Sequence, residues 1–341
     1  MGGDHGPSAV IEAASMTLDA EKKNLYFLFF GIESKIKDEV SKYQNLSGKY
    51  EIIHTDTVIS NDEKPSTALR QGKTSSMRMA IDSVSQKKSD CVVSAGNTGA
   101  LMAMAKLVLK PLPGIYRPAI ASIFPSMTGK TILLDLGANL VCDGENLAQF
   151  AILGSVYAKA VMGLSKPTVG ILNIGSEDMK GHDSLREAAA ILSEAEFPGI
   201  YKGFVEGNDI ALGTVDVIVT DGFTGNVALK TAEGVGKLIG HYMREAFKSS
   251  IFAGIGYMFA SGAIKRLKKK TDPRDYNGGL FLGLKGICVK SHGSSDAYAF
   301  SHAIGEAVHM VENKFNEKVA TEIANLSNQE SFIAQNVKVN G

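Results

Sequence analysis

Four times along this chain, a short apolar run ends in a glycine-containing turn with an asparagine, and a segment with helical spacing follows. The four runs begin near residues 90, 131, 168 and 215. They are almost continuously apolar, which is typical of strands covered by helices on both faces. Strands that alternate with helices predict an α/β fold with a doubly wound, mainly parallel sheet. Such sheets bind ligands beyond the carboxyl ends of their strands, where these turns lie.

The turns carry Asn97, Asn139, Asn173 and Asn226. Glycine lets the backbone approach a ligand closely. The helix that follows each turn offers free N–H groups and a partial positive charge to an anion. One such turn is weak evidence, because glycine is common at strand ends. Four of them favour a shared site for an anion or a carbonyl group.

The segments before the first turn follow a similar pattern. We expect a helix at 7–20, strands at 24–31 and 49–58 with an amphipathic helix between them, and a polar surface loop at 60–75.

The length of 341 residues suits one large α/β domain or two smaller ones. We expect a single catalytic domain over residues 1–333, with a projecting helical excursion at about 241–279. The tail at 334–341 is polar and is expected to fray.

Composition and charge narrow the classes of function. The formal net charge is zero, so no nucleic-acid partner is expected. The three cysteines form no C-x-x-C pair, which argues against a disulfide framework and a thiolate metal site and favours a reducing, cytoplasmic setting. The N-terminus does not resemble a signal peptide, and no apolar run of about 18 residues predicts a transmembrane helix.

Several common catalytic motifs are missing from the sequence. There is no P-loop, no dinucleotide-binding glycine fingerprint, no G-x-S-x-G elbow and no histidine pair at helical spacing. We therefore expect no metal ion, no cofactor and no covalent nucleophile. Positioning and electrostatic stabilisation would then carry the chemistry.

Eight stretches, spread in order over nearly the whole chain, resemble one family, the bacterial phosphate acyltransferases of the PlsX family. They are MGGDHGP (1–7), VVSAGNTGALMA (92–103), RPAI (117–120), LLDLGAN (133–139), LNIGSEDMKG (172–181), GFVEG (203–207), DVIVTDGFTGNVALKTAEG (216–234) and SHGSSDA (291–297).

The resemblance implies a reaction in which acyl carrier protein, charged with an acyl group, reacts with inorganic phosphate. The products are acyl phosphate, which feeds phospholipid synthesis, and free acyl carrier protein. It also implies a three-layer α/β/α fold related to phosphotransacetylases and isocitrate-dehydrogenase-like enzymes. The protein would be a homodimer in the cytoplasm, associated peripherally with the inner face of the membrane.

The chain departs from the family pattern in two places. Relatives begin with a short apolar strand ahead of the Met-Gly-Gly-Asp motif, whereas this sequence starts at Met1 of that motif. We therefore expect that strand to be absent and the edge of a neighbouring strand to be exposed. His182 stands where many relatives carry asparagine, and no function is assigned to it.

Lys180 and Asn226 are the candidates for catalysis. Phosphate needs orientation against the thioester carbonyl, and the carbonyl oxygen needs a donor as charge develops on it. Lys180 would fix phosphate or stabilise that charge; the alternative is a solvated loop lysine beside Glu177 and Asp178. The amide of Asn226 would donate to the carbonyl oxygen or to phosphate; the alternative is a residue that only satisfies backbone N–H groups at a helix start.

Eight further residues are candidates for binding phosphate or substrate, because each lies in a strand-end turn or a glycine-rich loop. They are Asp4, His5, Asn97, Thr98, Asn139, Asp221, His292 and Ser294. Each has a structural alternative: Asp221 could simply end a strand, Asn97 could belong to a plain turn, and His292 could be a buried histidine bonded to a loop carbonyl.

The helical excursion combines apolar residues at helical spacing with a basic cluster. The cluster consists of Lys265, Arg266, Lys268, Lys269 and Lys270. It suits contact with acidic acyl carrier protein or with an anionic membrane surface. The alternative is a helix buried at a dimer interface with a solvated basic end.

Two other classes of function remain open from the residues alone. One is an NAD-dependent dehydrogenase on the related fold, which would need a metal site of clustered aspartates and a cofactor loop. The other is a non-catalytic, membrane-associated scaffold, in which the Lys180 and Asn226 loops would have no purpose.

Overall fold

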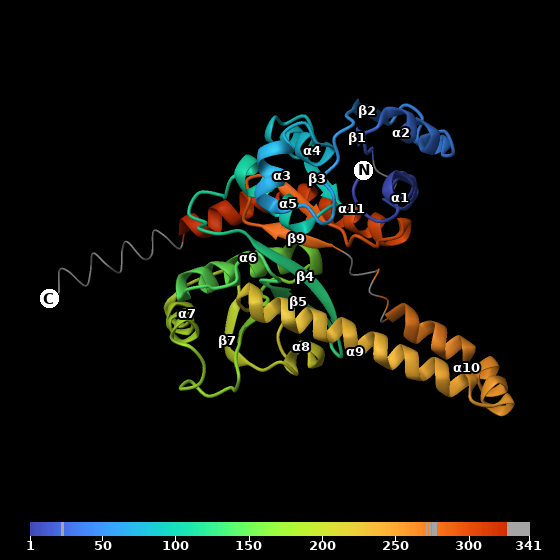
Figure 1. The fold of residues 1–341 in the computed structure, drawn as a ribbon. Helices are drawn as coiled ribbons and strands as arrows, with labels where there is room; N and C mark the ends of the chain where they lie inside the picture. The colour runs from blue at the N-terminus through green and yellow to red at the C-terminus, as the bar shows by residue number, and fades with distance from the viewer. Residues whose placement is uncertain (22–23, 271, 273, 275–277, 326–341) are drawn as a thin grey trace.

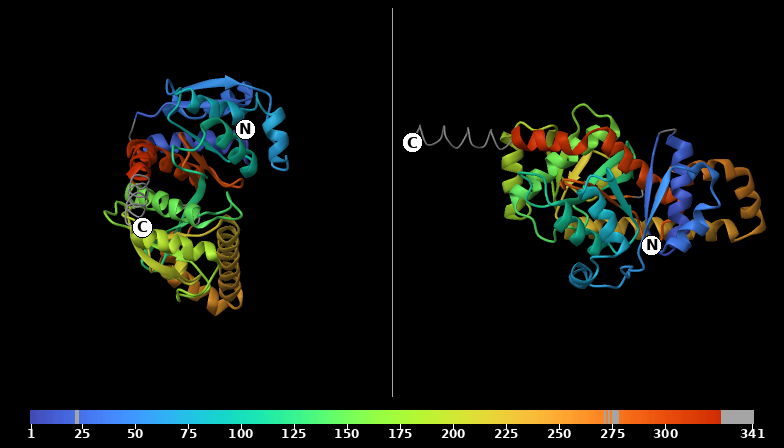
Figure 2. Two further views of the ribbon diagram at one scale, coloured as in Figure 1. Left: turned by 90° about the vertical axis from the view of Figure 1, so that its left-hand side faces the viewer. Right: turned by 90° about the horizontal axis from the view of Figure 1, so that it is seen from above.

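An eight-stranded sheet runs through both lobes of the molecule (Figures 1 and 2). The computed structural model describes residues 1–21, 24–270, 272, 274 and 278–325. The strand order is β3-β10-β9-β4-β5-β8-β6-β7. The strands are β3 (Cys91–Ser94), β4 (Ala119–Ser126), β5 (Gly129–Leu134), β6 (Thr168–Leu172), β7 (Ile200–Val205), β8 (Val217–Val219), β9 (Gly279–Leu282) and β10 (Ile287–Lys290).

The sheet is mainly parallel, as predicted, but its middle is antiparallel. Strands β5, β8, β6 and β7 are parallel to their neighbours, and so are β3 and β10. The antiparallel pairs are β10–β9, β9–β4 and β4–β5. β4 and β5 form a hairpin, because the two residues between Ser126 and Gly129 leave room only for a tight turn. Strands β4, β7 and β9 and this reversal were not predicted from the sequence.

Helices cover both faces of the sheet. Figure 1 places α1 to α5 and α11 in one lobe and α7, α8 and the start of α9 in the other. The helices are α1 (Gly6–Glu21), α2 (Glu33–Val40), α3 (Pro65–Gln71), α4 (Ser76–Ser85), α5 (Thr98–Leu109), α6 (Gly144–Met162), α7 (Asp183–Glu194), α8 (Asp209–Leu212), α9 (Gly222–Lys248), α10 (Ile251–Lys270) and α11 (Ala297–Glu312).

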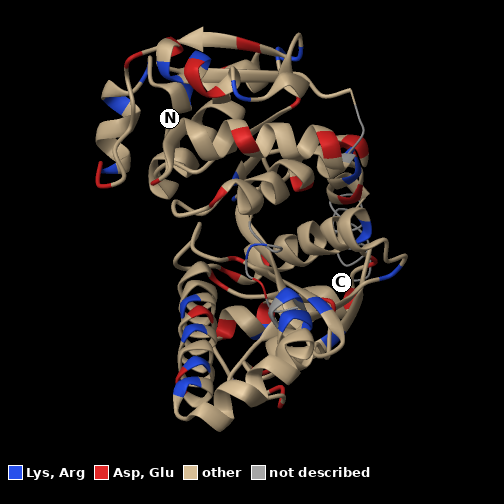
Figure 3. Ribbon diagram, turned by 90° about the vertical axis from the view of Figure 1, so that its right-hand side faces the viewer, with Lys and Arg blue, Asp and Glu red and all other residues tan. Residues whose placement is uncertain are grey.

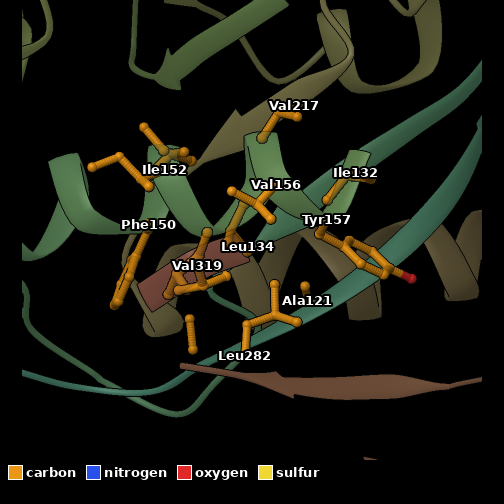
Figure 4. Close-up of a cluster of buried hydrophobic side chains, with 14 of the residues drawn as sticks. Ala121, Ile132, Leu134, Phe150, Ile152, Val156, Tyr157, Val217, Leu282 and Val319 are labelled. Carbon is orange, nitrogen blue, oxygen red and sulfur yellow. The ribbon is translucent and has the colours of Figure 1, made fainter. Parts of the chain in front are cut away.

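The largest core lies between α6 and the sheet (Figure 4). Side chains alternate along β5: Ile132 and Leu134 point into this core, whereas Leu133 joins a smaller cluster on the opposite face. On that opposite face Ala228 and Leu229 of α9 pack against the sheet. Both faces of the strands are therefore buried, as their continuous apolar sequences predicted.

Two elements outside the main sheet bear on the predictions. The strands β1 (Phe27–Gly31) and β2 (Tyr50–His54) form a separate two-stranded parallel sheet. Among the described residues, β1 and β3 each pair on one side only. The segment 60–75, predicted as a loop, contains α3, so that prediction is wrong; Pro65 at the first position of this helix starts it.

The pair α9–α10 projects from the body of the molecule (Figure 1). Its first helix begins at Gly222, in the fourth turn, so the projection is continuous with that turn, and the predicted bounds of 241–279 stay a prediction. Within the described part of the chain, no helix is long and apolar enough to cross a membrane. Residues 334–341 lie outside the described residues, and the single-domain assignment to 1–333 stays a prediction.

Candidate active site

Three of the four asparagine turns lie along one edge of the sheet. β5, β8 and β6 are adjacent and parallel, so the turns that follow them leave from the same side. These turns carry Asn139, Asn226 and Asn173. Asn97 follows β3, which lies at the far end of the strand order in the other lobe.

The carboxylate of Asp135 organises the turn after β5. Its Oδ1 accepts N–H bonds from Ile120 at 2.9 Å, Ala138 at 3.0 Å and Gly137 at 3.3 Å. Its Oδ2 accepts from the backbone N–H of Asn139 at 2.7 Å and from the Asn139 side chain at 2.9 Å. Burial raises the pKa of Asp135, and these hydrogen bonds oppose the rise. The turn is therefore held from inside by a buried acceptor.

Asn139 is a structural member of that turn. Its amide nitrogen donates to the carbonyl of Pro118 at 2.8 Å and to Asp135, which uses both amide hydrogens. Its backbone carbonyl accepts the N–H of Gly222 at 2.7 Å and so ties the turn to the start of α9. Direct donation from this amide to phosphate, as expected from the sequence, is not favoured by this geometry.

The start of α9 presents Asn226. Asp221 caps the helix by accepting from the N–H and hydroxyl of Thr224 at 2.8 and 2.9 Å, so its carboxylate shapes the helix start. Asn226 is the fifth residue of α9 and lies beside Gly137, where an added Cβ would be 3.8 Å from the Asn226 Cβ. The exposed amide of Asn226 bonds to no other described residue. It is therefore available to a ligand at a helix N-terminus.

Gly225 lets α9 start this close to β5. Any side chain at Gly225 would collide with the backbone carbonyl of Asp135. The second glycine of the Gly-Phe-Thr-Gly stretch is thus required for the approach of the helix, and the approach places Asn226 over the turn.

The loop after β6 carries Lys180. Asn173 closes this loop by donating to the carbonyl of Lys180 at 3.1 Å and accepting the N–H of Ile174 at 2.8 Å. Lys180 is about half exposed, and its Nζ lies 2.7 Å from Oε1 of Glu177. Glu177, one of the two acids expected beside a solvated Lys180, is therefore its partner. Because this ion pair is exposed and weak, an anionic ligand can replace Glu177. His182 lies before α7 and makes no side-chain cap bond.

Asn97 has a structural function in the other lobe. Its Oδ1 accepts the N–H of Ala100 at 2.9 Å and caps α5. Its Nδ2 lies 2.9 Å from the carbonyls of Asn61 and Glu63 and 3.2 Å from that of Ser60. These bonds hold the segment before α3 against the strand end, so the amide is occupied.

The N-terminal loop lies against the same strand end. The N–H of Asp4 donates to the carbonyl of Gly293 at 2.8 Å, and the amide of Asn61 lies 3.4 Å from Asp4 Oδ1. His5 and Thr98 are exposed. The structure therefore brings Asp4 and His292's loop together with the turn that carries Asn97.

His292 links this lobe to α9. Its Nδ1 accepts the N–H of Ser294 at 3.3 Å and lies 2.9 Å from the Ser294 hydroxyl. Burial lowers the pKa of His292; Lys230 lowers it further, and Glu233 acts in the opposite direction. These charges belong to α9, so the electrostatic environment of His292 includes that helix. With Nδ1 accepting the N–H of Ser294, the proton of the neutral ring is on Nε2.

The basic cluster lies on the return helix of the projection. Lys265, Arg266 and Lys269 are exposed near the end of α10. The side chains of Lys268 and Lys270 lie outside the described residues. Blue bands in Figure 3 mark basic residues along the projecting pair.

Three residues in or beside these turns were not predicted from the sequence: Asp135, Lys230 and Lys290. Asp135 and Lys290 each stand at the end of an apolar run, where a charge beside a buried strand signals the mouth of a site. Lys230 follows Asn226 by four residues, which places both on one side of a helix.

Residues 1–318 match the family described as "Fatty acid synthesis protein". The chain belongs to this family. A phosphate acyltransferase of Rhodospirillum centenum is 55% identical over 326 residues, covering 96% of this chain and 92% of that protein. That of Paramagnetospirillum magneticum is 51% identical over 326 residues, covering 96% and 93%. The family resemblance drawn from the motifs is confirmed.

Solved structures of lower identity share the fold. A phosphotransacetylase from Streptococcus pyogenes has a TM-score of 0.60 at 14% identity and covers 90% of this chain and 92% of its own. A branched-chain phosphotransacylase from Enterococcus faecalis V583 has a TM-score of 0.53 at 13% identity, with 89% and 95% covered. These likenesses confirm the predicted relation of this member of the fatty acid synthesis protein family to the phosphotransacetylase fold.

Proposed function

We propose that this chain transfers an acyl group from acyl carrier protein to inorganic phosphate, giving acyl phosphate for phospholipid synthesis. The family and the relatives named phosphate acyltransferase support acyl transfer to phosphate. The observation that links this reaction to a particular residue is the amide of Asn226, which makes no hydrogen bond to any described residue. It lies near the N-terminus of α9, beside Gly137 in the turn that the Asp135 carboxylate holds.

In the proposed reaction a phosphate oxygen attacks the thioester carbonyl carbon. The new C–O bond forms as the C–S bond breaks, and the proton of hydrogen phosphate ends on the carrier thiol. Because a thiolate leaves readily, the main requirements are alignment and stabilisation of the carbonyl oxygen. Asn226 would donate to that oxygen. Lys180 would leave its ion pair with Glu177 and pair with phosphate instead.

The remaining residues would support the two walls of the site. Asp221, Asp135 and Asn139 shape the start of α9 and the turn beneath it. Asn97 and the Asp4 loop would shape the opposite wall, and His292 in the neighbouring loop would contribute to phosphate binding there.

The projecting pair would make the contacts beyond the site. Large apolar side chains are exposed on it, including Leu238 at 49%, Tyr242 at 60% and Phe252 at 86%. We propose that a second copy of the chain covers part of this surface in a homodimer. Lys265, Arg266 and Lys269 would attract the acidic carrier protein, and the apolar tip would give peripheral contact with the membrane.

The test is a single reaction with purified protein. Acyl carrier protein charged with a fatty acyl group should release free thiol and yield acyl phosphate only when inorganic phosphate is added. Reactions without phosphate and with a nicotinamide cofactor serve as controls. Turnover that requires nicotinamide would favour a dehydrogenase, and no turnover under any of these conditions would favour a scaffold.

A further inference from the structure

Lys290 is a buried lysine that forms no ion pair with any carboxylate of the described residues. It ends β10, pairs with Ser94 of the parallel strand β3, and is 8% exposed. Its Nζ lies 3.5 Å from the carbonyl oxygen of Ala95 and contacts that of Ser291. Among the described residues it is the one lysine or arginine that is buried.

Such a placement costs free energy unless something compensates for the lost hydration. Burying an ammonium group is unfavourable when it is not paired, and an apolar side chain of similar length would fit the same space more cheaply. The Asp4 carboxylate acts on Lys290 through its charge, and the described residues show no ion pair between the two. Burial lowers the pKa of Lys290 to about 8, and Asp4 opposes this.

The ammonium stands where three segments of the site wall meet. Ala95 leads into the turn with Asn97, and Ser291 leads into the loop with His292. Asp4 bonds to Gly293 of that same loop at 2.8 Å. A charge at this junction attracts two carbonyl dipoles and one carboxylate at once, and the field of Lys290 also reaches His292.

We propose that Lys290 is a positioning residue for acyl transfer: its ammonium group holds the Asn97 turn and the His292 loop in register with the Asp4 loop. The inference rests on the proposed function for its kinetic part. The charged form is the one that attracts the carbonyl oxygens, so loss of the proton releases the two loops from each other. Activity should therefore fall on the alkaline side as Lys290 deprotonates.

The surrounding charges leave Lys290 as the group that sets this alkaline limit. Asp4 faces it from the N-terminal loop, and His292 follows it on its own loop with a pKa that is already low. Lys230, Glu233 and Lys237 of α9 act on His292. Phosphate is a dianion throughout this range and gains no proton on the alkaline side.

The first experiment compares wild type, Lys290→Met and Lys285→Met. Lys285 is an exposed lysine just before β10 and provides the same substitution outside the site. We expect Lys290→Met to lower kcat/KM roughly 10- to 100-fold, as misplacement of site groups does. Its Tm at pH 7 should equal or exceed that of wild type, because a buried charge is removed. Lys285→Met should match wild type in both.

The pH dependence separates positioning from a plain structural function. Wild-type kcat/KM should decline as pH rises through about 8, the pKa of Lys290. Lys290→Met should lack this decline. Unaltered kcat/KM in Lys290→Met, or a loss explained by a lower folded fraction, overturns the proposal.

A stability measurement tests the buried ammonium without any activity. The folded pKa of about 8 lies below the ordinary value of 10.5, so the unfolded chain binds more protons between these values. Wild type should therefore gain stability relative to Lys290→Met as pH rises from about 8 to 10.5. A constant difference overturns the assignment of a buried charge. Absence of phosphate-dependent turnover in wild type would instead refute the proposed function.

Discussion

Asn139 and Asn226 follow two neighbouring parallel strands, β5 and β8, yet their amides are used differently. The Asn139 amide is buried and spends both hydrogens on Pro118 and Asp135. The Asn226 amide is exposed beside Gly137 and bonds to none of the described residues. The same residue type after a strand therefore serves either to build the wall of a site or to meet its ligand. The comparison predicts that the two substitutions separate stability from activity.

The largest effect is expected for Asn226→Ala. Loss of one preorganised donor to a developing oxyanion should lower kcat by about 10²- to 10³-fold. Unfolding should be unchanged, because the amide makes no bond within the described protein. Steady-state kinetics and thermal denaturation measure the two quantities. Asn208→Ala, at an exposed helix start without a side-chain cap bond, is the matched control. Near wild-type turnover in Asn226→Ala would show that this amide does not contact the reacting groups.

Lys180→Ala should come next, with a fall in kcat of about 10²-fold for loss of one charge partner in the transition state. The lysine is about half exposed and bonded to Glu177 alone among described side chains, so folding should be intact. Lys202→Ala on the exposed side of β7 removes the same charge outside the loop. The assay is the same phosphate-dependent release of carrier thiol. Equal turnover in both variants would make Lys180 a solvated loop residue.

Asn139→Ala should affect stability first. Its removal leaves buried acceptors at Pro118 and Asp135 with fewer donors, which costs about 1–3 kcal/mol in the free energy of unfolding. Chemical denaturation measures this cost. Activity should fall through displacement of α9 by way of the bond to Gly222. If the variant is as stable as wild type but inactive, Asn139 contacts the substrate, as proposed for Asn226, and does not only hold the turn.

The smallest effect is expected at the exposed basic residues of α10. Charge reversal at Lys265 and Lys269 should raise the KM for acyl carrier protein by roughly 3- to 10-fold, because surface charges steer association. Added salt should raise the wild-type KM in the same way. The kcat should not change, since α10 lies outside the site. A KM independent of salt would instead favour the dimer interface as the purpose of this helix.

Much of the architecture was predictable because it depends on local patterns. Continuous apolar runs identified β3, β5, β6 and β8, and helical spacing identified the helices that follow them. The parallel edge that gathers Asn139, Asn173 and Asn226 follows from this alternation. Strands β4, β7 and β9 were not predicted. The antiparallel middle of the sheet was not predicted either, because strand direction depends on pairing partners that periodicity does not identify.

The sequence by itself determined the repeated strand–turn–helix units, the glycines that let α9 approach β5, and the family. Only the tertiary structure decided which polar groups of these turns are occupied. The amide of Asn97 donates to backbone carbonyls more than thirty residues away in the chain. Lys290 is buried against Ala95, which lies 195 residues away. Burial and hydrogen bonding depend on distant segments that meet on folding, whereas periodicity and glycine are local properties of the chain.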